Sequence, residues 1–170
     1  MNAQEIKNIL IAYLKAANHE IRIYQEKSIG NAVCDLMTVT NCLTGYEIKS
    51  DLDNYQRLNH QITAYDRFFE KCYIVVGGRH LKSVGQKVPG RWGIITIQSD
   101  QVTVNRAARA GKPACNRQLG VLWKLELSNL LTKAGLPLYT YKSKQYIIDR
   151  IVEHLDKAEI KRHVAYELMH

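Results

Sequence analysis

The sequence lacks the cysteine and histidine patterns that hold zinc or build a disulfide framework. Its four cysteines are scattered without a C-x-x-C pair, and no histidines are clustered beside them. We therefore expect reduced thiols, several of them buried, and neither a zinc knuckle nor a disulfide-stabilised fold. The four residues are Cys34, Cys42, Cys72 and Cys115.

Long apolar runs are also missing. The longest, at 73–76 and 93–97, fall well short of the roughly 18 residues that cross a bilayer. Glu5 and Lys7 stand where a signal peptide would need apolar residues. These absences predict a cytoplasmic protein with no membrane partner.

Proline is scarce, with three residues in 170, and no internal repeat is present. Because 46% of the residues are hydrophobic, the composition is that of a globular protein and not of a disordered or collagen-like one. The length suits a single compact domain, which excludes a multidomain enzyme.

Negative charge is scarce in one part of the chain. The net charge is +8, and residues 101–150 hold nine Lys and Arg against two Asp and Glu, whereas the rest is nearly balanced. Such a block predicts a polyanionic partner, here DNA, although a solvated face gives the same pattern. The residues expected to line a DNA track are Arg106, Arg109, Lys112, Arg117, Lys142 and Lys144.

Hydrophobic periodicity predicts an α/β fold with a mixed central sheet and C-terminal helices. We expect an α/β core over residues 1–105, a basic loop over 106–118 and a helical extension over 119–170. The expected elements are a helix at 5–17, strands at 20–28, 32–39 and 43–50, a helix ending at 71, a strand at 72–76, a short helix near 80–87, a strand at 92–97, and helices at 119–134, 143–155 and 157–169.

Two carboxylates are predicted to face each other in the second and third strands. If these strands form a hairpin centred on residue 41, position i pairs with position 82−i, and Asp35 lies opposite Glu47. Lys49 leaves the same face of the sheet as Glu47, because strand side chains alternate. Opposed carboxylates repel, so we expect a compensating cation. It is either Lys49 alone, in an exposed charge cluster, or a divalent ion such as Mg²⁺.

The order of these residues resembles the PD-(D/E)xK, or restriction-endonuclease-like, nuclease superfamily. Asp35 is followed after eleven residues by Glu47-Ile48-Lys49, and helix, three strands, helix and strand is that family's αβββαβ core. The string Gly45–Asp51 and the later Pro89-Gly90-Arg91-Trp92-Gly93 are similar to small bacterial and prophage members. The resemblance covers about residues 5–97.

The resemblance implies a role for each residue of this motif. Asp35 and Glu47 would bind a catalytic Mg²⁺, with Mn²⁺ as a substitute, and the backbone carbonyl of Ile48 would add a ligand. Lys49 would orient or deprotonate the attacking water and stabilise charge on the phosphorus centre. Cys34 stands where the family has a proline.

Further positions match the family outside the motif. Glu5 matches a glutamate that the family often has on its first helix; Glu26 is the competitor, and a first-turn acid that favours the helix dipole is the alternative for Glu5. Gln61 and Tyr65 match the Q-x-x-x-Y motif of RecB-type members, in which the glutamine hydrogen-bonds near the active site. Otherwise Tyr65 is a core residue and Gln61 a surface residue.

The resemblance therefore implies a Mg²⁺-dependent nuclease that hydrolyses DNA phosphodiester bonds in a repair, recombination, phage or defence context. The alternative is a non-catalytic nucleic-acid-binding or regulatory module that keeps the fold.

The C-terminal helices resemble SAP-type DNA-binding modules, with a helical cap on the core as the competing interpretation. Many nucleases of this size pair to cut both strands, so a homodimer is also expected as one arrangement.

Overall fold

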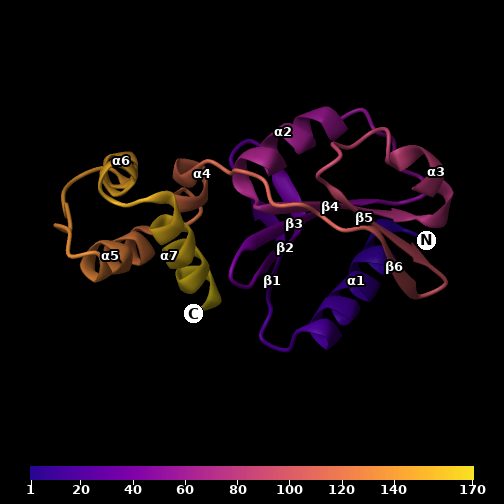
Figure 1. Ribbon diagram of the computed structural model, residues 1–170, viewed down its shortest axis with the longest axis horizontal. Helices are drawn as coiled ribbons and strands as arrows, with labels where there is room; N and C mark the ends of the chain where they lie inside the picture. Colours follow the sequence, from indigo (N-terminus) through magenta and orange to yellow (C-terminus); the bar gives the residue numbers. More distant parts are fainter.

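The computed structural model describes residues 1–170 and contains one six-stranded sheet whose strand order follows the sequence (Figure 1). The strands at the two edges pair antiparallel with their neighbours, whereas β3, β4 and β5 run parallel to one another. The fold is thus α/β with a mixed sheet, as expected. The strands are β1 (Arg22–Ser28), β2 (Val33–Val39), β3 (Leu43–Lys49), β4 (Lys71–Gly77), β5 (Gly93–Gln98) and β6 (Gln101–Arg106).

Helices cover both faces of the sheet. On one face α1 (Ala3–Ala17) packs Ile6, Leu10 and Leu14 against the central strands. On the other face lie α2 (Leu58–Phe68) and the C-terminal helices. The order α1, β1, β2, β3, α2, β4 is the αβββαβ order expected from the sequence. The remaining helices are η1 (Gly78–His80), α3 (Leu81–Val84), α4 (Cys115–Leu119), α5 (Lys124–Lys133), α6 (Lys144–His154) and α7 (Lys157–Met169).

Strand β3 lies at the centre of the molecule, and every one of its residues is buried. Gly45 is required there, because a Cβ atom at this position would come within 2.4 Å of the Phe69 ring. Glu47 and Lys49 are therefore charged side chains in a strand that is covered on both faces. Burial of charge is costly unless the group is paired, so these two residues need a specific environment.

The C-terminal helices belong to the main hydrophobic core. Leu119, Leu130 and Ile151 are fully buried in the cluster that also contains residues of β2 and β4. The Tyr24 hydroxyl of β1 donates to the carbonyl of Leu168 at 2.6 Å, which fixes the end of α7 to the sheet. These helices therefore form a cap that is continuous with the core, as one of the two sequence interpretations expected.

One strand was not expected from the sequence. β6 pairs with β5 through a hairpin whose turn residues, Ser99 and Asp100, both have positive φ, 48° and 64°. Such turns usually contain glycine, which is absent here, so the usual sequence signal is missing. The expected basic loop is correspondingly shorter, because Arg106 ends β6 and α4 begins at Cys115.

None of the helices combines the length and the hydropathy needed to cross a bilayer.

Candidate active site

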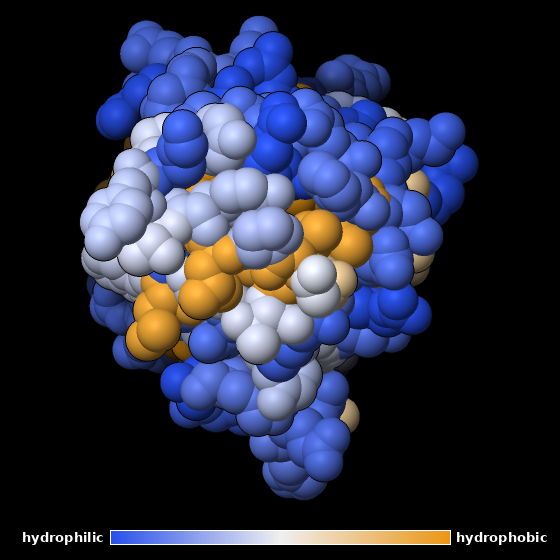
Figure 2. Space-filling model, turned by 90° about the vertical axis from the view of Figure 1, so that its left-hand side faces the viewer, coloured by the Kyte–Doolittle hydropathy of each residue, from blue (hydrophilic) through white to orange (hydrophobic).

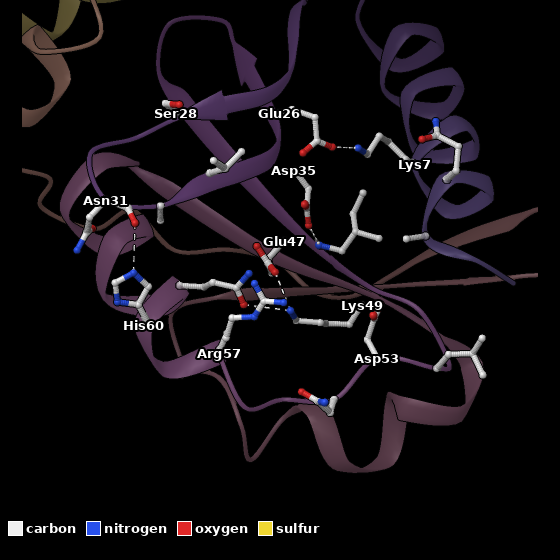
Figure 3. A pocket seen from close by; sticks show the side chains of 18 of the residues that line it. Lys7, Glu26, Ser28, Asn31, Asp35, Glu47, Lys49, Asp53, Arg57 and His60 are labelled. Atoms are coloured by element: carbon white, nitrogen blue, oxygen red, sulfur yellow. Dashed lines mark hydrogen bonds and ion pairs between the residues drawn. The ribbon is translucent and has the colours of Figure 1, made fainter.

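An open cavity of about 1090 Å³ lies between α1, the β1–β2 turn, the end of β3 and the start of α2 (Figure 3). Asp35 of β2 and Glu47 and Lys49 of β3 all line it. Gln61 of α2 and Ile48 also border it. The structure therefore brings together, at one hollow, the residues of the sequence motif.

The predicted hairpin register is confirmed. The observed pairs run from Val39 opposite Leu43 to Leu36 opposite Tyr46, and each obeys the 82−i rule. The ladder ends just before Asp35, where the N–H of Ile48 donates instead to Oδ2 of the Asp35 carboxylate at 2.8 Å. The strands thus separate at the step where the two acids would face each other, which opens the cavity.

Glu47 is almost completely buried, with 1% of its surface exposed, and both of its oxygens have partners. Oε1 lies 2.9 Å from the Lys49 ammonium, and Oε2 accepts from the Tyr65 hydroxyl at 2.8 Å. The Lys49 ammonium also donates to Oε1 of Gln61 at 3.0 Å. The buried charges are thus compensated inside a four-residue network drawn from β3 and α2.

The Asp35 carboxylate makes no ion pair. Burial, and then the negative charge of Glu47, raise the pKa of Asp35 to about 7, while the hydrogen bond from Ile48 opposes this shift. Asp35 thus lies near a second carboxylate and has no cation of its own within ion-pair distance. A cation that entered the cavity between the two acids would oppose the repulsion between them.

Tyr65 is both a core residue and a site residue, so the two sequence interpretations of it are combined. Its side chain has no solvent exposure and packs against Phe69 and Trp92 with ring centroids 5.2 and 5.4 Å apart. Its hydroxyl meets Glu47 and also accepts from the N–H of Asp35 at 3.3 Å. Burial holds the pKa of the Tyr65 phenol well above its ordinary value, so the hydroxyl stays a donor.

Of the two glutamates that the sequence offered as an accessory acid, Glu26 lines the cavity and Glu5 does not. Glu5 is exposed and exchanges two hydrogen bonds of 2.9 Å with Asn2 in a capping box, so its carboxylate is used at the N-terminus of α1. Glu26 of β1 lines the cavity and pairs with Lys7, a buried cation on the sheet side of α1. Sequence reasoning did not single out Lys7, because a lysine outside the apolar stripe of Ile6, Leu10 and Leu14 is expected to face solvent.

No group of three or more His, Cys, Asp or Glu side chains is arranged to hold a metal ion in residues 1–170. A metal at this site would therefore be held by the two carboxylates of Asp35 and Glu47, with the Ile48 carbonyl and water completing its shell. Mg²⁺ suits such a sparse set, because it is bound through one or two carboxylates and keeps several waters.

Comparison with known proteins gives the family. The family model described as Bacteriophage P4 protein cII matches residues 1–170. The chain belongs to this family. Protein cII of Enterobacteria phage P4 is 30% identical over 145 residues, covering 80% of this chain and 55% of that protein. The chain thus spans about half the length of this curated relative.

Two solved structures are similar to this cII-family chain. A protein of unknown function from Silicibacter pomeroyi matches 69% of this chain and 79% of its own, with 16% identity and a TM-score of 0.53, which shows a shared fold. The structure of Pyrococcus furiosus SfsA in complex with Ca²⁺ matches 59% of this chain and 60% of its own at 14% identity. Its TM-score of 0.35 is too low to support an argument.

In this cII-family chain the expected DNA-track residues do not line the cavity. Arg106 instead donates to the carbonyls of Trp92 at 2.7 Å and Pro89 at 3.0 Å, so it holds the turn before β5. Lys144 donates to the carbonyl of Gly120 at 2.7 Å. The side chains of the other four, Arg109, Lys112, Arg117 and Lys142, are exposed.

Proposed function

We propose that this cII-family chain is a Mg²⁺-dependent nuclease that hydrolyses phosphodiester bonds of DNA in a phage, repair, recombination or defence context. The observation that carries the proposal is the convergence of Asp35, Glu47 and Lys49 at one open cavity. Glu47 and Lys49 are buried charges in the central strand, and Asp35 is half-buried beside them. Such burial costs stability, which is typical of a functional site and unnecessary for the fold.

The residues present fit a hard divalent cation. Asp35 and Glu47 supply two carboxylates, and burial together with the charge of Glu47 raises the pKa of Asp35, a shift that a bound cation would oppose. Mg²⁺, or Mn²⁺ in its place, would supply a Lewis acid and lower the pKa of a bound water when present.

The protein's own groups would divide the remaining work. The Lys49 ammonium lies 2.9 Å from Oε1 of Glu47 and 3.0 Å from Oε1 of Gln61, which fixes it at the cavity wall. There it can orient the attacking water and stabilise the charge that develops on the phosphate. Gln61 positions Lys49, and Tyr65 positions Glu47. Arg57 also lines the cavity, where it can contact a DNA phosphate.

The test is incubation of the purified chain with supercoiled plasmid, branched DNA and single-stranded DNA in Mg²⁺, Mn²⁺ or EDTA. Cleavage should need the metal and should be lost in Asp35→Asn and Glu47→Gln. Glu20→Gln, at an exposed acid in the α1–β1 connection, is the matched control and should cut normally. Cleavage that survives Glu47→Gln would overturn the proposal. DNA binding without cleavage by the wild-type chain would instead assign a non-catalytic module.

A further inference from the structure

Two aromatic side chains stand in solvent at the end of the molecule formed by α5 and α6. Trp123 is 75% exposed and Tyr141 is fully exposed. Leu125, which is 74% exposed, follows Trp123 on the first turn of α5. Figure 2 views this end and shows a hydrophobic band across it, bordered by hydrophilic residues. Contiguous exposed apolar surface is typical of a binding site, and the exposed aromatic rings lie at the same end of the molecule.

The surroundings of these aromatics are basic. Residues 120–144 contain four lysines and one acid, Glu126. The bond from Lys144 to the Gly120 carbonyl, at 2.7 Å, holds the turn that precedes Trp123 against the start of α6. The Lys142 ammonium lies 5.0 Å from the centre of the Tyr146 ring, so cation and aromatic groups alternate along this segment.

A second hollow of about 370 Å³ adjoins the active-site cavity on the side of α4 and α6. Ser28, at the end of β1, and Gly30, in the β1–β2 turn, line both hollows, while Arg117, Gly120 and Gln145 line only the second. No acidic residue lines this second hollow. The Arg117 guanidinium lies beside Gly30, with Nη1 3.6 Å from the position that a Cβ atom would take there. A path without negative charge thus leads from the cavity toward Gly120 and α6.

We propose that the surface formed by Arg117, Trp123, Tyr141 and Lys142 binds single-stranded DNA that extends from the active-site cavity. The proposal rests on the proposed nuclease function, because the strand is the one that the cavity would hold. Unpaired bases can stack on exposed aromatic rings and their phosphates can meet cations, whereas a duplex keeps its bases stacked inside. An apolar protein partner would gain little from the cations around the aromatic rings, whereas single-stranded DNA matches both features.

Tryptophan fluorescence offers a direct test. The chain has two tryptophans, and Trp92 is fully buried, so a ligand-dependent change reports Trp123. We expect oligothymidylate, added in EDTA so that no cleavage occurs, to quench the emission in a saturable way. A duplex of equal length should quench it far less. Equal quenching by the duplex would overturn the single-strand assignment.

Variants separate stacking from general apolar contact. Trp123→Ala and Tyr141→Ala should each weaken oligothymidylate binding about tenfold in fluorescence anisotropy, and Trp123→Phe, which keeps a ring face, should retain most of the affinity. Leu125→Ala is the matched control, because it removes a side chain of similar exposure without a ring, and it should bind normally. A loss in Leu125→Ala equal to that in Trp123→Ala, or self-association that Trp123→Ala abolishes, would show an apolar protein interface and overturn the proposal.

The binding and cleavage results are independent. Because binding is measured without metal, a chain that quenches with oligothymidylate but never cuts DNA would overturn the nuclease proposal and support this surface. A chain that cuts DNA but shows no quenching would support the nuclease proposal and overturn the single-strand surface.

Discussion

The Tyr65 hydroxyl donates a hydrogen bond of 2.8 Å to Oε2 of Glu47, and both side chains are buried away from solvent. This bond joins α2 to β3 and gives the buried carboxylate a donor that solvent cannot provide. Lys49 supplies the partner of the other oxygen. The candidate site thus depends on contacts from α2 as well as on the β2–β3 hairpin.

Removal of the Tyr65 hydroxyl is expected to weaken both the fold and the site. Tyr65→Phe keeps the ring packing but leaves a buried carboxylate short of a donor, which should lower the free energy of unfolding by about 1–3 kcal/mol. Urea denaturation measures this change, and DNA cleavage should fall in parallel. Tyr13→Phe, at a side chain that is 40% exposed, is the control and should change neither quantity.

Lys49 is expected to act on the reaction and not on metal binding. Lys49→Met keeps much of the apolar stem but removes the ammonium. Mn²⁺ binding, measured by calorimetry, should therefore persist, while DNA cleavage should be lost. Lys82→Met, at an exposed lysine of α3, should leave both unchanged. Normal cleavage by Lys49→Met would show that another group performs this role.

The pKa of Asp35 predicts how the stability of the metal-free protein depends on pH. Burial and Glu47 raise this pKa to about 7 in the folded state, whereas the unfolded chain has the ordinary value of 3.8. The folded state therefore binds the proton more tightly, and the stabilisation by protonated Asp35 is lost as pH rises through about 7.

Asp35→Asn removes this titration because the amide is always neutral. In EDTA, the variant should be more stable than the wild type at pH 8, and the difference should shrink toward zero as pH falls to about 4. Denaturation curves at several pH values test this, and a stability difference that does not change with pH would contradict it.

The two accessory acids should behave differently. Glu5→Ala should cost about 0.3–1 kcal/mol of stability through the loss of a first-turn acid, with no effect on cleavage. Glu26→Ala should alter cleavage, because it removes a cavity residue and leaves the buried Lys7 ammonium without its partner. Equal cleavage by both variants would remove Glu26 from the site.

Substitutions of Arg106 and Arg117 should likewise have different effects, the first on stability and the second on DNA binding. Arg106→Ala should destabilise the fold by about 1–3 kcal/mol, because the carbonyls of Trp92 and Pro89 lose their donor. Arg117→Ala should leave stability unchanged and weaken DNA binding, with a shallower dependence on salt. The comparison requires denaturation and binding curves for both variants at two salt concentrations.

The sequence by itself determined the order of the core elements and the register that relates Asp35 to Glu47. Both follow from local rules, since side chains alternate along a strand and a hairpin's turn fixes which residues pair. The motif Glu47-Ile48-Lys49 and the spacing of Gln61 and Tyr65 were recognised instead by their resemblance to a nuclease family. The β6 strand was missed because its Ser99-Asp100 turn has no glycine.

Only the tertiary structure decided what surrounds these residues. The pairing of Lys7 with Glu26, the use of Glu5 as a capping residue and the use of Arg106 to hold a turn depend on how elements distant in the sequence pack together. The exposure of Trp123 depends on the same packing, because an aromatic residue at the start of a helix can be either exposed or buried in a core. Local periodicity sets the face on which a side chain lies, but only packing decides what that face meets.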